Sequence, residues 1–210
     1  MRLADIERPL TATMILACLA MLAGCASNSS ATPDARYDLG APPTASAAAA
    51  PAISPTRPVK VLAVSAPRNL ETDAFVYRLS YVDAQRTGSY STSHWTMPPA
   101  QLLTQRLRDA LSARGPVLSG ADPVRAPLLE IELTGFEQVF DAPEQSHGVV
   151  SVRATLTQQG RVLAQRAFAA SASAPSADAS GGARALAAAS DDLIAQLRVW
   201  LDAQPLAASR

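Results

Sequence analysis

The sequence has few cysteines and histidines, the residues that most often carry thiol, acid–base or metal chemistry: Cys18, Cys25, His94 and His147. Cys25 is set apart by its surroundings, because it follows an apolar run over residues 10–23 and precedes a polar stretch. The run is shorter than the roughly 20 residues that cross a bilayer, but it has the length of the apolar core of a signal peptide. Alkylation of the Cys25 thiol is therefore the first chemistry that the sequence predicts.

Residues 22–25, Leu-Ala-Gly-Cys, resemble the lipobox of bacterial lipoproteins. In those proteins the chain is cut before the cysteine, the thiol is diacylated and the new amino group is usually acylated as well. The resemblance implies a signal peptide over residues 1–24 and lipid, including palmitate, on Cys25. Two or three acyl chains hold a protein at a membrane far more firmly than one. An ordinary signal peptide with an accidental cysteine is the alternative.

The residue after the cysteine, Ala26, bears on which membrane would hold the protein. Lipoproteins of enteric bacteria that carry Asp at this position stay in the inner membrane, so by this resemblance Ala26 indicates an outer-membrane protein that faces the periplasm. Cys18 would leave with the signal peptide and Cys25 would be alkylated. We therefore expect no disulfide in the mature protein, even in an oxidising compartment.

No other stretch forms a local catalytic or metal-binding motif. The two histidines do not fall in H-x-H or H-x-x-x-H spacing, and no G-x-S-x-G or S-x-x-K stretch is present. A serine triad assembled in space remains an alternative, but we predict no enzyme activity, no catalytic residue, no metal site and no cofactor. Simpler interpretations fit the other conspicuous residues: a helix-start linker for Gly181 and Gly182, solvated faces for Asp191, Asp192, Glu130 and Glu132, and core packing for Trp95 and Trp200.

The charges of the chain are balanced, with 18 basic and 18 acidic residues and no cluster of Lys or Arg. Proteins that bind nucleic acids carry a basic excess or a basic patch, which neutralises phosphates. The sequence therefore predicts no nucleic-acid partner.

The composition divides the chain into three parts. Residues 1–24 are the predicted signal peptide, and residues 25–58 hold the lipidated cysteine, a small polar tether and a Pro/Ala-rich linker. Within the second part, residues 37–39, Tyr-Asp-Leu, are a candidate first strand. Residues 59–204 have the apolar periodicity of a globular domain, which is long enough to bury a core.

The elements that would form this domain follow from its periodicity. Alternating apolar residues predict strands, Gly135 interrupts one of them as a bulge would, and Gln159-Gly160 predicts a tight hairpin turn. Pro98 and Pro99 can begin a helix, and a second apolar stripe precedes Pro205. The expected strands cover 59–64, 75–81, 90–95, 129–140, 150–157 and 162–168, the expected helices cover 99–111 and 183–204, and residues 171–182 are expected to form a loop. The predicted class is α+β, a mostly antiparallel sheet with two amphipathic helices packed on one face.

The segment 90–103, Tyr-Ser-Thr-Ser-His-Trp-Thr-Met-Pro-Pro-Ala-Gln-Leu-Leu, resembles the ABC-type transport auxiliary lipoproteins. Their pattern is an aromatic strand with a Trp, followed by a helix that starts at proline and carries leucines on successive turns. The Tyr-x-Leu stretch at 37–39, the acidic and aromatic strand 129–140 and the Ala-rich last helix with Trp200 match in the same order. The resemblance covers nearly all of residues 25–203.

The resemblance implies a non-enzymatic auxiliary subunit at the outer membrane. Such proteins accompany ABC transporter components and a protein with MCE domains, and together these move phospholipid or other hydrophobic molecules between the two membranes. The implied partners are the MCE-domain protein, the ABC components and the membrane that holds the lipid anchor, while formation of a homo-oligomer stays open. The alternatives are a structural or assembly lipoprotein of another envelope complex and a periplasmic hydrolase.

Overall fold

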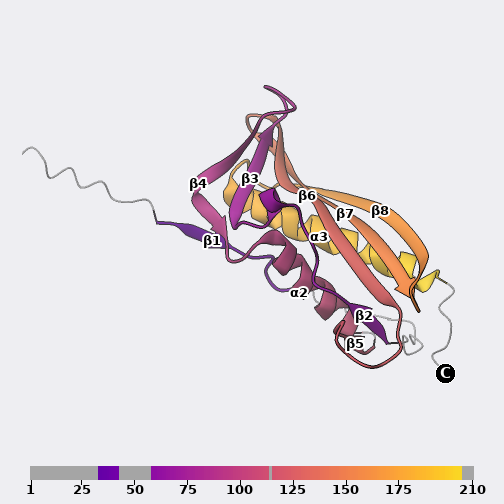
Figure 1. The fold of residues 1–210 in the computed structure, drawn as a ribbon. Helices are drawn as coiled ribbons and strands as arrows, with labels where there is room; N and C mark the ends of the chain where they lie inside the picture. Colours follow the sequence, from indigo (N-terminus) through magenta and orange to yellow (C-terminus); the bar gives the residue numbers. More distant parts are fainter. Residues whose placement is uncertain (1–32, 43–57, 114, 205–210) are drawn as a thin grey trace, which may run out of the picture. The chain divides into compact units, whose positions relative to one another are not determined.

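The structure is a computed structural model that describes residues 33–42, 58–113 and 115–204 (Figure 1), in which a compact unit begins at Asp34. The strands of this unit are β1 (Ala35–Tyr37), β2 (Val59–Val61), β3 (Ala74–Leu79), β4 (Thr87–Trp95), β5 (Val117–Leu118), β6 (Leu128–Ala142), β7 (Gln145–Gln158) and β8 (Arg161–Ser173). The helices are α2 (Pro99–Ser112), α3 (Ala179–Asp202) and the short 3₁₀ turn η3 (Arg68–Leu70).

The strands form one mixed sheet. β1 lies parallel to β4, β2 to β5 and β6, and β3 to β6, whereas the pairs β3–β4, β6–β7 and β7–β8 are antiparallel. The α+β class is confirmed, and the expectation of a mostly antiparallel sheet is met only in part: among the described strands four of the seven pairs are parallel, whereas the long pairs β6–β7 and β7–β8 are antiparallel. Tight turns impose antiparallel pairing on consecutive strands, whereas β3 and β6 are separated by β4, α2 and β5, so that no turn fixes their direction.

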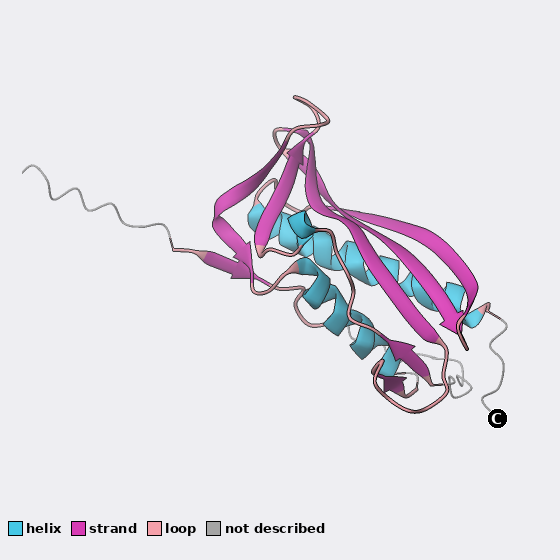
Figure 2. Ribbon diagram, in the orientation of Figure 1, coloured by secondary structure: helices cyan, strands magenta, loops and turns pink. Residues whose placement is uncertain are grey.

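The longest strands, β6, β7 and β8, form two successive hairpins (Figure 2). The predicted bulge is confirmed, because the register of β6 against β7 shifts between Leu133 and Gly135. The predicted turn is confirmed as well: Gln159 and Gly160 have φ of 52° and 77°, the left-handed conformation that a two-residue hairpin turn requires.

Helix α2 begins where its prolines predict. Pro99 occupies the first turn, where a backbone N–H has no acceptor within the helix, so the N–H that proline lacks costs no hydrogen bond. The leucine face is buried at Leu102, Leu103, Leu107 and Leu111. Thr104 Oγ1 accepts a hydrogen bond from Val64 N at 2.8 Å, which joins the helix to the chain that follows β2.

The segment expected to be a loop, residues 171–182, is largely regular structure. Strand β8 continues to Ser173, and α3 begins at Ala179, capped by Asp178, whose Oδ1 accepts a hydrogen bond from Gly181 N at 2.7 Å. An aspartate at the N-cap satisfies a free backbone donor, so the helix starts earlier than its apolar stripe. The small polar residues of this segment obscured both boundaries, and only residues 174–178 connect the two elements.

Helix α3 contacts β6, β7 and β8, and α2 contacts α3 (Figure 2). The helix approaches β7 closely, because a Cβ added at Gly148 would lie 2.6 Å from Leu186 N. Along β6, Leu129, Ile131 and Leu133 are buried, whereas Glu130 and Glu132 between them are exposed. One face of the long strands therefore lies in the core and the other faces solvent. In the part of the chain that the structure describes, no helix is long and apolar enough to span a membrane.

Candidate functional site

The predicted site residue, Cys25, and residues 1–32 around it lie outside the described residues. The structure does describe the next segment, residues 33–42, through which a lipid on Cys25 would be connected to the domain. The contacts of this segment with the domain determine how far from the domain a lipid on Cys25 could lie.

Strand β1 fastens the segment to the sheet. It pairs in parallel with β4, Tyr37 opposite Trp95, and Thr96 N donates a hydrogen bond to Tyr37 O at 2.8 Å. The Tyr37 ring meets Phe75 edge to face at 6.0 Å, and Leu39 is buried in the core. The candidate first strand does pair with the sheet, although it starts at Ala35 and leaves Leu39 beyond its end.

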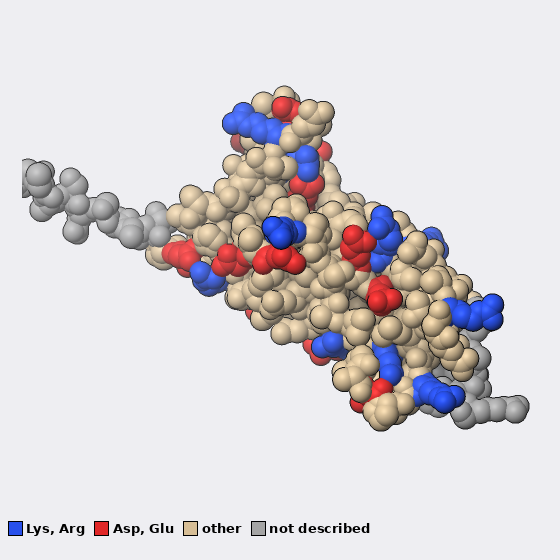
Figure 3. Space-filling model, in the orientation of Figure 1, with Lys and Arg blue, Asp and Glu red and all other residues tan. Residues whose placement is uncertain are grey.

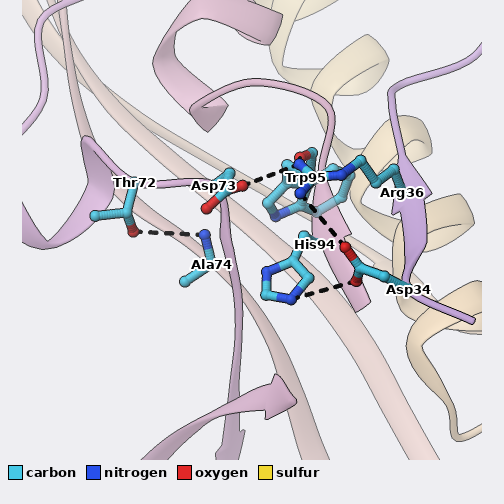
Figure 4. Close-up of polar contacts among 7 residues, drawn as sticks. All are labelled: Asp34, Arg36, Thr72, Asp73, Ala74, His94 and Trp95. Atoms are coloured by element: carbon cyan, nitrogen blue, oxygen red, sulfur yellow. Dashed lines mark hydrogen bonds and ion pairs between the residues drawn. The ribbon is translucent and has the colours of Figure 1, made fainter. Parts of the chain in front are cut away.

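Exposed charges surround this attachment (Figure 4). Arg36 Nη1 lies 3.0 Å from Asp73 Oδ2, Arg36 Nη2 lies 3.4 Å from Asp34 Oδ2, and His94 Nε2 lies 3.4 Å from Asp34 Oδ1. The two ion pairs of Arg36, at such exposure, contribute about 0–1 kcal/mol each. Tyr37 and Leu39 therefore hold the segment more strongly than its charges do.

A buried arginine ties the same segment to both helices. The side chain of Arg106, on α2, is only 6% exposed and donates two hydrogen bonds to Asp191 of α3, from Nε to Oδ1 at 2.7 Å and from Nη2 to Oδ2 at 2.8 Å. Its Nη1 donates to Gly40 O at 2.8 Å. Asp191 is therefore a structural residue, and its interpretation as part of a solvated face was wrong.

We expect Asp191→Ala to lower the free energy of unfolding by about 2–3 kcal/mol, because removing one partner of a buried pair leaves the other charge uncompensated. Asp192→Ala, at the exposed neighbouring position, is the matched control and should change stability by less than about 0.5 kcal/mol. Urea unfolding followed by circular dichroism measures both. Equal effects of the two substitutions would contradict the role given to Asp191.

The two histidines occupy separate, singly paired positions. His94 lies beside Asp34, and His147 Nδ1 lies 2.7 Å from Asp141 Oδ2. Among the residues that the structure describes, no group of three or more His, Cys, Asp or Glu is placed to hold a metal ion.

The glycines and the tryptophan discussed next, which the sequence analysis singled out, have structural roles. Gly181 N donates a hydrogen bond to the N-cap residue Asp178. A Cβ at Gly182 would lie 2.1 Å from Gln138 Oε1, so a glycine at this position lets Gln138 pack closely against α3. Trp200 is buried, and its ring meets Phe168 at 5.6 Å. Core packing accounts for this tryptophan, as predicted.

The solvent-facing side of the sheet carries charges of both signs (Figure 3). Arg78 binds Glu137 through two hydrogen bonds of 3.0 and 2.9 Å, and Arg153 Nη1 donates to Glu132 Oε2 at 2.8 Å. In these two pairs, neighbouring charges of opposite sign neutralise each other.

Sequence reasoning missed a pocket of about 340 Å³ at the end of the β3–β4 hairpin. Its walls are mostly aromatic and aliphatic, and none of its lining residues is charged: Tyr77, Leu79, Ser89, Tyr90, Ser91, Phe140 and Ala177. The register of β3 against β4 shifts at Phe75, because Ala74 pairs with His94 whereas Val76 pairs with Ser89. Residues 90–93 of β4 therefore lie opposite Phe75 alone, and β4 bends beside the pocket. The alternation of aromatic residues in β3 was visible in the sequence, but their meeting with Phe140 depends on the parallel β3–β6 pairing.

A polar chain beneath the pocket fixes Tyr90. Its hydroxyl donates to Gln138 Oε1 at 3.0 Å, while Gln138 Nε2 donates to Ser146 Oγ at 2.8 Å and to Asp178 O at 3.2 Å. Burial, followed by the nearby charge of Asp178, raises the pKa of Tyr90 to about 12. A tyrosine hydroxyl is protonated at neutral pH even at its ordinary pKa of about 10, and the raised pKa of Tyr90 extends the range in which it donates this bond to more alkaline solution.

The fold and the pairing of β1 define the class of protein: an α+β domain whose N-terminal strand, β1, pairs with β4 of the sheet. The fold recurs in protein XCC0632 from Xanthomonas campestris, with a TM-score of 0.62 and 20% identity over 80% of this chain and 92% of that one. It also recurs in the crystal structure of an uncharacterized protein, with a TM-score of 0.64 and 20% identity over 80% of this chain and 99% of that one. Among curated proteins no match was found.

The chain belongs to the family of ABC-type transport auxiliary lipoprotein components, whose model matches residues 37–198. The resemblance inferred from residues 90–103 and their context is thereby confirmed. Membership makes the protein a membrane-anchored envelope lipoprotein associated with ABC transport, and the family is not a known class of enzyme.

Proposed function

We propose that this chain is the outer-membrane docking subunit of an ABC-type system that moves lipid between the two membranes, and that it acts by binding an MCE-domain protein without catalysing a reaction. The observation that carries the proposal is the family match over residues 37–198. The anchor fits this role, since cleavage before Cys25 would leave a lipidated end that leads, within ten residues, into β1.

Because β1 pairs with the sheet, only the chain between Cys25 and Asp34 sets the distance between the domain and the membrane that holds its anchor. The chain from Cys25 to Asp34 spans at most about 30 Å, at about 3.3 Å per residue. A domain on so short a tether stays close to its membrane, so the partner from the opposite membrane must cover most of the periplasm. An MCE-domain protein anchored in the inner membrane would fill that distance.

Crosslinking in cells tests the proposal. The full-length lipidated chain, purified after crosslinking, should carry the MCE-domain protein encoded beside it, and the Cys25→Ser form should recover much less of it. A lipidated chain that crosslinks to no MCE-domain protein would refute the proposed partner. A hydrolase activity lost on substituting His94 or His147 would refute the non-enzymatic role.

The outer-membrane placement has its own test. Ala26→Asp introduces the inner-membrane retention signal of enteric bacteria, and we expect it to move most of the protein from outer-membrane to inner-membrane fractions in an enteric host. Sucrose-gradient fractionation measures the distribution, and Ala26→Ser is the matched control that should leave it unchanged. Wild-type protein found wholly in inner-membrane fractions would contradict the placement.

A further inference from the structure

Strand β8 (Arg161–Ser173) forms a free edge of the sheet (Figure 1). It pairs with β7 on one side, and among the described strands none pairs with its other side. The backbone N–H and C=O groups of its 13 residues that do not face β7 therefore have no partner strand. An unpaired edge of this length is a template for pairing with another strand.

The opposite side of the sheet ends in two short strands. β1 has three residues and β5 has two, and β1 carries the ion-paired Arg36. Short edge strands and charged side chains are the usual means by which a protein keeps an edge from pairing with another chain. β8 is long, and its residues 167–173 are uncharged, being alanines, serines and one phenylalanine. Of the described edges, β8 is therefore the one that is open to a further strand.

Helix α3 lies along the same edge. It contacts β7 and β8 (Figure 2), and its Gln196 Nε2 donates to Ala169 O of β8 at 3.5 Å. Val199 follows Gln196 by three positions, so both side chains lie on the same side of the helix. Val199 is 72% exposed, and Val162 and Leu163 of β8 are 65% and 40% exposed. Exposed apolar side chains therefore accompany the unpaired backbone on this side of the domain.

The spacing of strand and helix favours a second copy of the chain over a lone strand. Paired strands lie about 4.8 Å apart, so contacts with both β7 and β8 place the axis of α3 about 2.4 Å inside β8. Two copies joined edge to edge through β8 would bring their α3 helices to about 10 Å from each other. Helices pack at about 8–10 Å. A strand of an unrelated protein would pair with β8 but leave Val199 exposed, whereas a second copy covers both.

We propose that two copies of this chain pair through β8 in antiparallel orientation, so that their sheets become one and Val199 packs against α3 of the second copy. A two-fold axis perpendicular to the sheet relates identical strands in this way and keeps both α3 helices on the same face. With the axis near Ala170, residues 167–173 face the same uncharged residues of the second copy, so no like charges meet. β1, which leads to the lipid anchor, lies on the other side of the sheet and takes no part in the pairing. The dimer goes beyond the proposed function and does not depend on the MCE-domain protein.

Disulfide formation in cells tests the pairing of β8. With Cys18 removed and Cys25 alkylated, an introduced cysteine has no partner within its own chain. Five full-length variants each carry one cysteine at a solvent-facing position of β8: Gln165→Cys, Ala167→Cys, Ala169→Cys, Ser171→Cys and Ser173→Cys. Two controls carry it at exposed positions of the β3–β4 loop and of β6: Val82→Cys and Glu130→Cys.

A disulfide requires Cα atoms within about 7 Å of each other. Disulfide-linked dimers should therefore be at least fivefold more abundant for one or two neighbouring β8 variants than for either control. Two differently tagged copies in the same cell identify the product as a dimer of this chain. Equal yields from the controls, no dimer from any β8 variant, or a disulfide from β8 to a different protein would each overturn the proposal.

Sedimentation equilibrium of the lipidated chain, in a detergent matched to the density of the solvent, tests the helix contact. Val199→Glu should raise the dissociation constant of the dimer at least tenfold, whereas Val82→Glu, at an exposed valine far from β8 in the sequence, should change it less than twofold. Both variants should keep the circular dichroism spectrum of the wild type. Unfolding measured below this dissociation constant reports the monomer, in which this side of α3 stays exposed. A monomeric wild type, or a Val199→Glu chain that dimerises as tightly as Val82→Glu, overturns the proposal.

Discussion

Replacement of Cys25 by serine is expected to abolish lipid attachment and to leave the precursor uncleaved. Serine keeps the size of the side chain but lacks the nucleophilic thiol, and the lipobox peptidase requires a lipidated cysteine after its cleavage site. Each buried methylene of an acyl chain contributes about 0.8 kcal/mol to membrane binding, so loss of two or three acyl chains removes the lipid anchor. Labelling of cells with radioactive palmitate, followed by immunoprecipitation, measures the attachment.

Cys18→Ser is the matched control, because Cys18 lies in the apolar run of the same signal peptide. Its label and its mature size should equal those of the wild type. Palmitate that persists in Cys25→Ser, or that disappears in Cys18→Ser, would show that the lipidated residue was assigned wrongly.

Trp95→Ala is expected to lower the free energy of unfolding by about 3–5 kcal/mol, the usual cost of removing a large buried aromatic side chain. Trp95 is 1% exposed, and its ring lies 4.5 Å from the ring of Phe75 and 5.3 Å from that of Phe136. It connects the β1 attachment, through Phe75 and Tyr37, to strand β6. Its loss would leave a cavity at the centre of this aromatic cluster.

Urea unfolding measures the effect, with Val199→Ala as a control. Val199 is 72% exposed on α3, so its truncation should change stability by less than about 0.5 kcal/mol. In a Trp200→Phe background, the fluorescence of Trp95 should be that of a buried indole. A solvent-exposed emission maximum together with an unchanged unfolding midpoint would contradict this burial.

Features that depend on neighbouring residues could be read from the sequence. Pro99 begins α2 because its ring and missing N–H suit a first helical turn, and Gln159-Gly160 turns β7 into β8 because both residues adopt positive φ. The break at Gly135 was visible as a change of phase in an alternating pattern. The lipobox around Cys25 is likewise a short contiguous motif, and the family pattern of residues 90–103 joins one strand to the helix that follows it. In each case the physical cause lies within a few residues along the chain.

Features that depend on distant residues required the folded structure. Burial of Arg106 makes Asp191 structural, although 85 positions separate them and Asp191 looks like any exposed helix carboxylate in the sequence. The parallel pairing of β3 with β6 brings Tyr77 and Phe140 to one pocket, and no turn between them sets that register. The same holds for β1, whose three residues have too little periodicity to predict a partner strand. Alternation along a strand specifies which side chains face the core, but the choice among possible neighbours depends on how the whole core packs.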